Sequence, residues 1–254
     1  MKLIVSTIVL DGMPWITWHL PMLNRLRGID WEWHVMEGVA APMHCTRWCS
    51  KIEPRVSGDG TTQYLDSIAS HPRVRIYRKP LWIGKIEMVN RPLGQKEPYV
   101  LLQADADELW TTSQVESIHW LLTKTQWKAA QFSCRFFVGP HIAVTERGGY
   151  GNRDSEWMRA WRMEPGMLFE RHEPPVVRGH RGIVATPPVT KDIGLVFDHY
   201  AYATEAQVAF KERFYKYEGA TAAWKRLQRH IGFPAPLNQF LPWVDTPSKV
   251  ELVA

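Results

Sequence analysis

Short apolar segments alternate with helix-like segments through the first half of the chain. Lys2–Val9 is apolar and rich in β-branched residues, and the turn Asp11-Gly12 follows it, which predicts a buried strand. Similar patterns predict strands at Trp31–Met36, Val74–Tyr77, Tyr99–Gln103 and Ala129–Phe137. Helical patterns lie between them at Trp15–Leu26, Thr62–Ile68 and Lys85–Leu93, and a fourth follows a capping box of Ser113 and Glu116. This alternation restricts the chain to the α/β class.

The order of the segments predicts a doubly wound, mainly parallel (mixed) sheet flanked by helices. Ligands of such sheets bind beyond the carboxyl ends of the strands. Asp11, Glu37 and Asp105 each follow a predicted strand, so we expect them on one rim. We expect residues 1–200 to form the domain that carries this rim. Residues 201–254 should add a helical extension of the same globular unit, with Thr204 and Gln207 capping its first helix.

The segment LLQADADELW, residues 101–110, places three carboxylates at the end of an apolar strand. Asp105, Asp107 and Glu108 are costly there unless a cation or hydrogen bonds compensate their charges. Hard oxygen ligands suit Mg²⁺ or Mn²⁺ bound together with a diphosphate. The alternative is a solvated acidic turn that caps the next helix, and the motif alone does not decide between the two.

The formal charge of +5 and the pI near 9.1 favour an anionic partner. The basic residues are dispersed rather than gathered in one stripe, which argues against nucleic acid. The odd set Cys45, Cys49 and Cys134 favours free thiols and a cytoplasmic setting. His44 beside Cys45 lacks the second ligand pair that a zinc site needs. No apolar stretch has transmembrane length, so we expect no integral membrane segment.

Three further motifs precede residues 101–110 in a fixed order. They are Glu37 after the second predicted strand, SGDGT at residues 57–61, and GKIEMVN at residues 84–90, which contains Lys85 and Asn90. Together the four motifs resemble the GT-A glycosyltransferases, in particular family 2 and its relatives. The resemblance covers residues 2–110, and the chain departs from the family pattern after Glu37, where a second acid is usual.

The resemblance implies a nucleotide-sugar site on the predicted rim. The residues that would contact the donor are Thr7, Val9, Asp11, Glu37, Lys85, Asp105 and Ala106. Asp105 would face the ribose and the metal, and Asp107 would be the firmer metal ligand. The later segment VFDHYAY, residues 196–202, also resembles the family, and it makes His199 the third metal ligand, with Asp198 behind it. A hydrogen-bonded, purely structural His199 is the alternative.

A sugar transferase that inverts the anomeric carbon also needs a base near the acceptor hydroxyl. The segment ERHEPP, residues 170–175, offers Glu173 first and His172 second, because relatives show a His-Glu pair here. Asp154 and Glu156 are rivals for the role, and all four residues are alternatively ordinary loop residues.

The resemblance therefore implies a glycosyltransferase that uses Mn²⁺ or Mg²⁺ and a UDP-sugar, with UDP-glucose as the first choice of donor. The acceptor would be a carbohydrate or another hydroxyl compound, and the transfer would proceed with inversion. A non-catalytic module that binds nucleotide sugars is one alternative. A metal-dependent phosphoesterase is another, although it would require more His and Asp ligands at other strand ends. The sequence makes no prediction of the oligomeric state.

Overall fold

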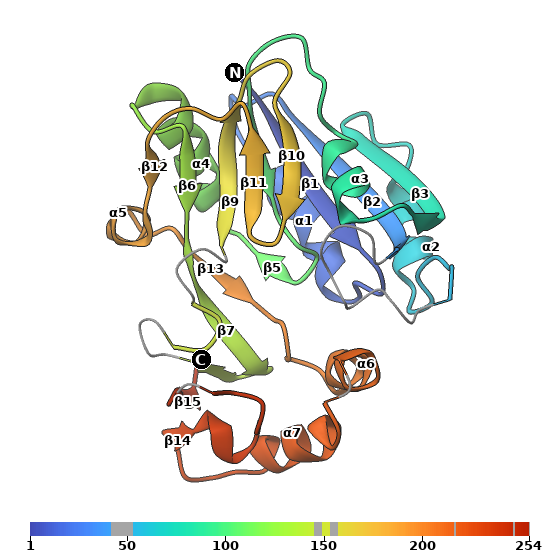
Figure 1. Ribbon diagram of the computed structural model, residues 1–254, viewed down its shortest axis with the longest axis vertical. Coiled ribbons are helices and arrows are strands. Elements are labelled where there is room, and N and C mark those ends of the chain that lie inside the picture. The colour runs from blue at the N-terminus through green and yellow to red at the C-terminus, as the bar shows by residue number, and fades with distance from the viewer. Residues whose placement is uncertain (42–52, 145–148, 153–156, 216, 246, 254) are drawn as a thin grey trace.

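The computed structural model describes residues 1–41, 53–144, 149–152, 157–215, 217–245 and 247–253. At its centre lies a seven-stranded sheet with the strand order β12-β6-β9-β4-β1-β2-β3 (Figure 1). Its strands are β1 (Lys2–Val9), β2 (Trp31–Ala40), β3 (Val74–Trp82), β4 (Tyr99–Gln103), β6 (Ala129–Gln131), β9 (Met158–Met163) and β12 (Val184–Ala185). β9 runs antiparallel to its two neighbours, whereas the other strand pairs are parallel. The predicted mixed, mainly parallel sheet is confirmed.

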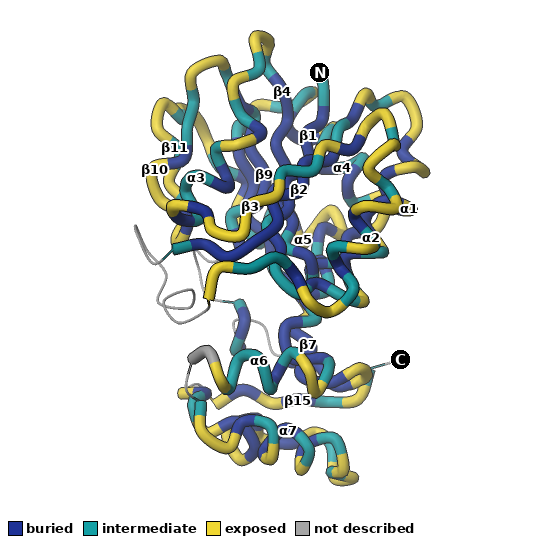
Figure 2. The backbone as a smooth tube through the Cα atoms, turned by 90° about the vertical axis from the view of Figure 1, so that its right-hand side faces the viewer, coloured by how far each residue is buried: buried dark blue, intermediate teal, exposed yellow. Residues whose placement is uncertain are grey.

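Both faces of this sheet are covered, which explains why its central strands are continuous apolar runs. Leu3 and Val5 of β1 face a core that includes side chains of three helices, whereas Ile4 faces a second core on the other side. The helices of the first face are α1 (His19–Leu23), α2 (Thr61–Ile68) and α4 (Thr112–Lys124). The second face is covered by α3 (Lys85–Asn90) and by the hairpin of β10 (Leu168–His172) and β11 (Pro175–Arg178). The central strands are accordingly buried along most of their length (Figure 2).

A second sheet lies beside the first, with the strand order β14-β15-β8-β7-β13-β5. Its strands are β5 (Glu108–Leu109), β7 (Ser133–Gly139), β8 (Ile142–Val144), β13 (Val196–His199), β14 (Ala235–Pro236) and β15 (Lys249–Leu252). Two helices, α6 (Glu205–Tyr215) and α7 (Ala220–Gln228), pack against each other next to this sheet (Figure 1). Because the chain leaves β4 in the first sheet and enters β5 in the second, residues 104–107 lie at the junction of the two.

Two local predictions were wrong in detail. The capping box of α4 is formed by Thr111 and Gln114 rather than by Ser113 and Glu116. Thr111 has the extended backbone of an N-cap, so the helix begins at Thr112 and Ser113 lies inside its first turn. The predicted strand 129–137 is divided at Phe132, where the chain passes from β6 to β7 and the Phe132 N–H donates to the carbonyl oxygen of Trp157 (3.0 Å).

The remaining helices are short. The segment predicted as a helix from Trp15 to Leu26 consists of a 3₁₀ turn, η1 (Trp15–Trp18), followed by α1. The last elements are α5 (Pro187–Asp192), which precedes β13, and the 3₁₀ turn η3 (Leu237–Gln239), which follows β14. Within the described part of the chain, no helix has both the length and the apolar character needed to cross a bilayer.

Candidate active site

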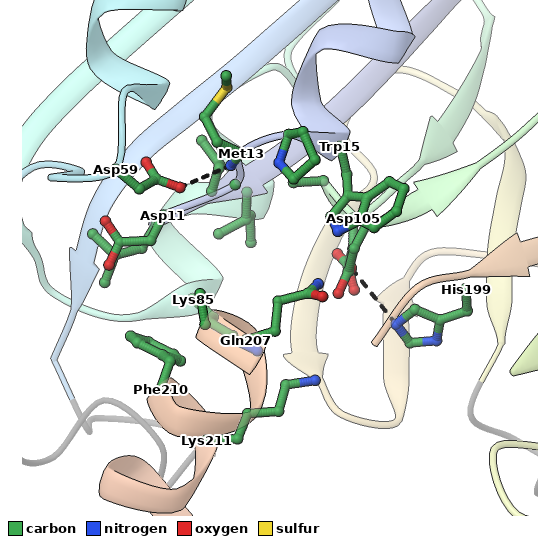
Figure 3. A pocket seen from close by; sticks show the side chains of 18 of the residues that line it. Asp11, Met13, Trp15, Asp59, Lys85, Asp105, His199, Gln207, Phe210 and Lys211 are labelled. Atoms are coloured by element: carbon green, nitrogen blue, oxygen red, sulfur yellow. Dashed lines mark hydrogen bonds and ion pairs between the residues drawn. The ribbon is translucent and has the colours of Figure 1, made fainter. Parts of the chain in front are cut away.

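A cavity of about 1220 Å³ opens beyond the carboxyl ends of β1 and β4 (Figure 3). Its walls are the loop after β1, the loop between β4 and β5, the turn between β10 and β11, and one side of α6. The predicted site residues that line it are Val9, Asp11, Lys85, Asp105, Ala106, Asp107, His172, Glu173 and His199. Segments far apart in the sequence therefore meet where the rule for parallel sheets places a ligand.

The pairing of β5 with β13 brings His199 to the Asp105–Asp107 loop. The two strands are antiparallel, with His199 opposite Glu108. The backbone N–H of Tyr200 donates to the carbonyl oxygen of Asp107 (2.8 Å). As a result, Nε2 of His199 lies 3.6 Å from Oδ1 of Asp107, at the cavity wall. Figure 3 shows the imidazole directed toward this loop.

Aromatic rings fix the orientation of the His199 imidazole. The rings of Phe136 and Trp157 contact it edge-on, with centroid distances of 5.1 and 4.8 Å. Its Nδ1 atom is buried and has no hydrogen-bond partner among the described residues. Burial raises the pKa of Asp107, but His199 and Lys211 together lower it by a larger amount, so the net pKa lies below the usual range. Asp107 is therefore an ionised carboxylate next to an imidazole nitrogen.

Asp105 belongs to a different network, centred on Arg159 of β9. Nη2 of Arg159 donates to Oδ2 of Asp105 (3.1 Å) and to Oε1 of Glu108 (2.6 Å), and its Nε contacts both Glu108 oxygens. Glu108 is fully buried and Arg159 is 4% exposed. Burial lowers the pKa of Arg159, but Glu108 and Asp105 raise it above its ordinary value. The third acid of the motif is thus a structural anchor, and Asp105 is only partly available to a cation.

Two side chains that the sequence did not indicate support this loop. One is Arg159, which reaches the motif from an antiparallel strand that lacks any recognisable pattern. The other is the buried His19 of α1, whose Nε2 donates to the carbonyl oxygen of Ala106 (3.1 Å) and whose ring stacks on Trp33. Burial lowers the pKa of His19, although Ala106 opposes the shift, so its imidazole is a neutral donor. A single histidine in a helical segment carries no signal of this contact in the sequence.

Glu173 and His172 stand at the turn between β10 and β11. Oε1 of Glu173 accepts from Nζ of Lys85 (2.7 Å), and it lies 3.3 Å from Nδ1 of His172 without the alignment of a hydrogen bond. The side-chain nitrogen of Gln103 donates to Nε2 of His172 (3.0 Å), which places the imidazole proton on Nδ1, next to Glu173. Burial raises the pKa of Glu173, but His172 and Lys85 lower it to about 2.

The SGDGT turn holds the loop after β1 in place. Asp59 accepts from the N–H groups of Thr61 (3.0 Å) and Met13 (2.8 Å), which is a structural role. Figure 3 shows the contact with Met13. Asp11 has a positive φ of 55° and accepts from the Gly58 N–H (2.8 Å). Both Asp11 carboxylate oxygens also contact the Arg55 guanidinium. Asp11 therefore lines the cavity as a member of an ion pair.

Three of the predicted side chains do not reach the cavity. Thr7 is fully buried, and its hydroxyl accepts from Nε1 of Trp33 (3.0 Å). Glu37 lies within β2, which is longer than predicted, and its buried carboxylate accepts from Nε of Arg78 (2.5 Å). Both carboxylate oxygens of Asp198 accept from Arg135 (2.5 and 2.6 Å) rather than from His199.

Several candidates lie outside the described residues. These are Asp154 and Glu156, the rivals for the catalytic base, and His44, Cys45 and Cys49. Cys134 is buried, and its thiol donates to the carbonyl oxygen of Gly151 (3.4 Å). Of the proposed bases, only Glu173 and His172 therefore have a described position, and both line the cavity.

The carboxylate of Asp107 and the imidazole of His199 fit a metal cation whose remaining coordination positions are filled by a bound substrate. Their facing atoms are 3.6 Å apart at an open cavity wall. Within the described ranges, no group of three or more His, Cys, Asp and Glu residues is arranged to hold a metal ion by itself. Mg²⁺ is commonly bound through one or two carboxylates plus substrate phosphates and water, and an incomplete set of this kind suits it or Mn²⁺.

No family model and no curated protein matches the sequence. Solved structures do match. S. aureus TarS 1-349 aligns over 94% of this chain and 74% of its own length, with 14% identity and a TM-score of 0.46. In its complex with UDP, 64% of this chain aligns at 11% identity and a TM-score of 0.43, and the match spans 47% of that protein, about half. The mannosyltransferase PcManGT from Pyrobaculum calidifontis, in complex with GDP-Man and Mn²⁺, aligns over 95% of this chain and 68% of its own, with 17% identity and a TM-score of 0.47.

Proposed function

We propose that this protein is a glycosyltransferase that moves a sugar from a nucleotide-sugar donor to a hydroxyl acceptor. The observation that carries the proposal is that two carboxylate–imidazole pairs line one cavity. Asp107 with His199 has the ligand types that a diphosphate-bound cation requires. Glu173 with His172 has the groups that accept a proton from a hydroxyl. A sugar transferase needs both functions in one site.

Asp107 and His199 would hold the cation, with Asp105 in reach from the Arg159 network. A bound divalent cation neutralises charge that develops on the departing diphosphate. The chain's own contribution is to keep the carboxylate of Asp107 ionised and the imidazole of His199 oriented by its aromatic neighbours. His19 and Arg159 keep the loop between them in a single arrangement, which lowers the cost of ordering the site.

Glu173 is the proposed base. The acceptor oxygen forms a bond to the anomeric carbon, the bond from that carbon to the donor phosphate oxygen breaks, and the acceptor proton passes to the Glu173 carboxylate. A single displacement of this kind inverts the anomeric centre. Lys85 and the Nδ1 proton of His172 stabilise the Glu173 anion before the transfer, at the cost of making it a weaker base. His172 itself, with Nε2 occupied by Gln103, is the less suitable acceptor of a proton.

The donor is proposed to be a UDP-sugar, and UDP-glucose is the first candidate because the sequence resembles GT-A family 2. The test measures release of the nucleoside diphosphate from UDP-glucose, UDP-GlcNAc and GDP-mannose in the presence of Mn²⁺. Each donor is offered a mixture of simple sugar acceptors. We expect release from a uridine donor by the parent protein and at least a hundredfold less by Glu173→Gln. Binding of a donor without release under any condition would support the non-catalytic module, and absence of binding by all three donors would contradict the proposed function.

A further inference from the structure

We infer that Lys211 of α6 binds the diphosphate of the donor, in addition to the metal cation that Asp107 and His199 would hold. This inference rests on the proposed function and adds a residue that the motifs of the first half did not indicate. Lys211 lines the cavity, and its side chain extends from α6 toward the side where Asp105 and His199 lie (Figure 3). The recognised chemistry is a diphosphate, whatever the attached nucleoside.

The other buried or half-buried cations of the cavity are already committed to carboxylates. Arg55 is paired with Asp11, and Lys85 is paired with Glu173. Arg159 is paired with Asp105 and Glu108. Lys211 differs from them, because within the described chain no carboxylate lies within ion-pair distance of its Nζ atom. Its Nζ atom donates a hydrogen bond to the neutral carbonyl oxygen of Ala201 (2.6 Å).

The position of Lys211 is fixed by the segment that also carries His199. Nζ lies 4.3 Å from the centroid of the Tyr202 ring. Helix α6 begins with a cap in which Thr204 and Gln207 bond to each other, and the side-chain nitrogen of Gln207 donates to the carbonyl oxygen of Tyr200 (2.7 Å). Residues 199–211 thus form one connected unit that presents an imidazole and an ammonium group to the same cavity. A lysine held in this way loses little further rotamer freedom when it binds a ligand.

The charges around Lys211 favour an anion that the chain itself does not supply. Lys211 is half-buried, and a lysine removed from water is costly unless a negative group accompanies it. The carboxylates of Asp107 and Asp105 attract its ammonium group from a distance without forming an ion pair with it. Asp105 is compensated by Arg159, and Asp107 is the proposed ligand of a cation. A cation at Asp107 and the ammonium of Lys211 would repel each other, and an anion of more than one charge that attracts both would outweigh this repulsion. A diphosphate is such an anion.

The test compares UDP with uridine, which lacks the phosphates, by calorimetry in the presence of EDTA. The variants are Lys211→Met, which keeps an unbranched side chain without charge, and Lys211→Arg, which keeps the charge. Lys225→Gln is the control, because Lys225 of α7 is ion-paired to Glu205 of α6 and does not line the cavity. We expect Lys211→Met to weaken UDP binding by roughly tenfold to a hundredfold, to leave uridine binding unchanged, and Lys211→Arg to restore most of the loss.

Equal affinity of Lys211→Met and the parent protein for UDP overturns the inference and leaves the proposed function intact. Equal losses for UDP and uridine also overturn it, since they indicate a structural role for Lys211. If Lys211→Met does not fold, as judged by its melting curve, Lys211→Gln takes its place: weaker UDP binding with unchanged uridine affinity supports the inference, and UDP affinity equal to that of the parent overturns it. A parent protein that binds neither UDP nor GDP, with or without Mn²⁺, contradicts the proposed function and the inference with it.

Discussion

Nε2 of His199 lies 3.6 Å from Oδ1 of Asp107, at a point where two sheets meet. The short strand β5 sets this distance, because it pairs with β13 directly after the Asp105–Asp107 loop. A carboxylate delivered by the first sheet is thereby joined to an imidazole delivered by the second.

Asp107→Asn should reduce metal-dependent turnover by at least about a hundredfold, because an amide is a much poorer ligand for a hard cation than a carboxylate. The fold should be retained, since Asp107 lines the cavity and its backbone carbonyl still accepts from Tyr200. Release of UDP and the far-ultraviolet circular dichroism spectrum measure the two expectations. Asp198→Asn is the matched control, because Asp198 pairs with Arg135 away from the cavity. Comparable activity losses in both variants would contradict a metal role for Asp107.

Glu173→Gln should lower kcat by about 10²- to 10⁴-fold and leave the affinity for the nucleotide nearly unchanged. The reason is that Glu173 is proposed to act on the acceptor proton rather than on the donor. Steady-state kinetics and UDP titration separate the two effects. A variant that loses donor affinity while retaining kcat would place Glu173 in the donor site instead.

Lys85→Met should shift the acid limb of the kcat/KM profile to higher pH. Burial raises the pKa of Glu173, and His172 and Lys85 lower it to about 2, so removal of the Lys85 charge returns this pKa toward its ordinary value near 4.5. The base is then protonated, and activity lost, at a higher pH than in the parent protein. Lys79→Met is the control, because Lys79 forms a comparable ion pair with Glu87 outside the cavity. An acid limb at the same pH in Lys85→Met and the parent protein would show that this limb does not report the ionisation of Glu173.

The same ion pair affects stability with a definite sign. The pKa of Glu173 is lower in the folded protein than in the unfolded chain. The ionised Glu173 therefore adds to the free energy of unfolding at any pH above its unfolded pKa of about 4.5, and this stabilisation is lost as pH falls from about 4.5 to about 2. Lys85→Met should therefore make the free energy of unfolding less dependent on pH within this window. Urea titrations of both proteins across the window check the expectation.

Arg159→Met should destabilise the fold by about 3–5 kcal/mol, because it leaves the fully buried Glu108 without its partner. The double variant Arg159→Met with Glu108→Leu should recover part of this loss, since no buried charge then remains unpaired. Urea denaturation of the parent, the two single variants and the double variant measures the coupling. A double variant as unstable as the sum of the single changes would show that the two residues act independently.

The regular part of the fold was predictable because its strands are buried on both faces and its loops end in turn residues. β1 and β4 have the predicted bounds, and the motif that follows β4 reaches the cavity. The second sheet was not predictable, because its connecting strand β5 is two residues long and has no period to detect. Glu37 was expected at the end of a strand, but β2 continues past it and buries it against Arg78.

The sequence also did not predict the hydrogen-bond partners of the site residues, since these partners come from distant segments. Arg159 lies on an antiparallel strand inserted into a parallel sheet, and His19 lies in a five-residue helix. Lys211 follows the predicted cap of α6, but only the packing of α6 against the cavity shows that this lysine faces the acids. Local patterns therefore pointed to several residues that line the cavity, and tertiary packing determines which of them meet.

The most direct test of the Asp107–His199 site is calorimetry of UDP with and without Mn²⁺, in the parent protein and in His199→Gln. His141→Gln is the control, because His141 is exposed and does not line the cavity. If the pair holds a cation together with the diphosphate, Mn²⁺ should tighten UDP binding by at least tenfold in the parent and in the control, and by much less in His199→Gln. An equal effect of Mn²⁺ in all three proteins, or no effect in any of them, would contradict the assignment of this junction as the donor site.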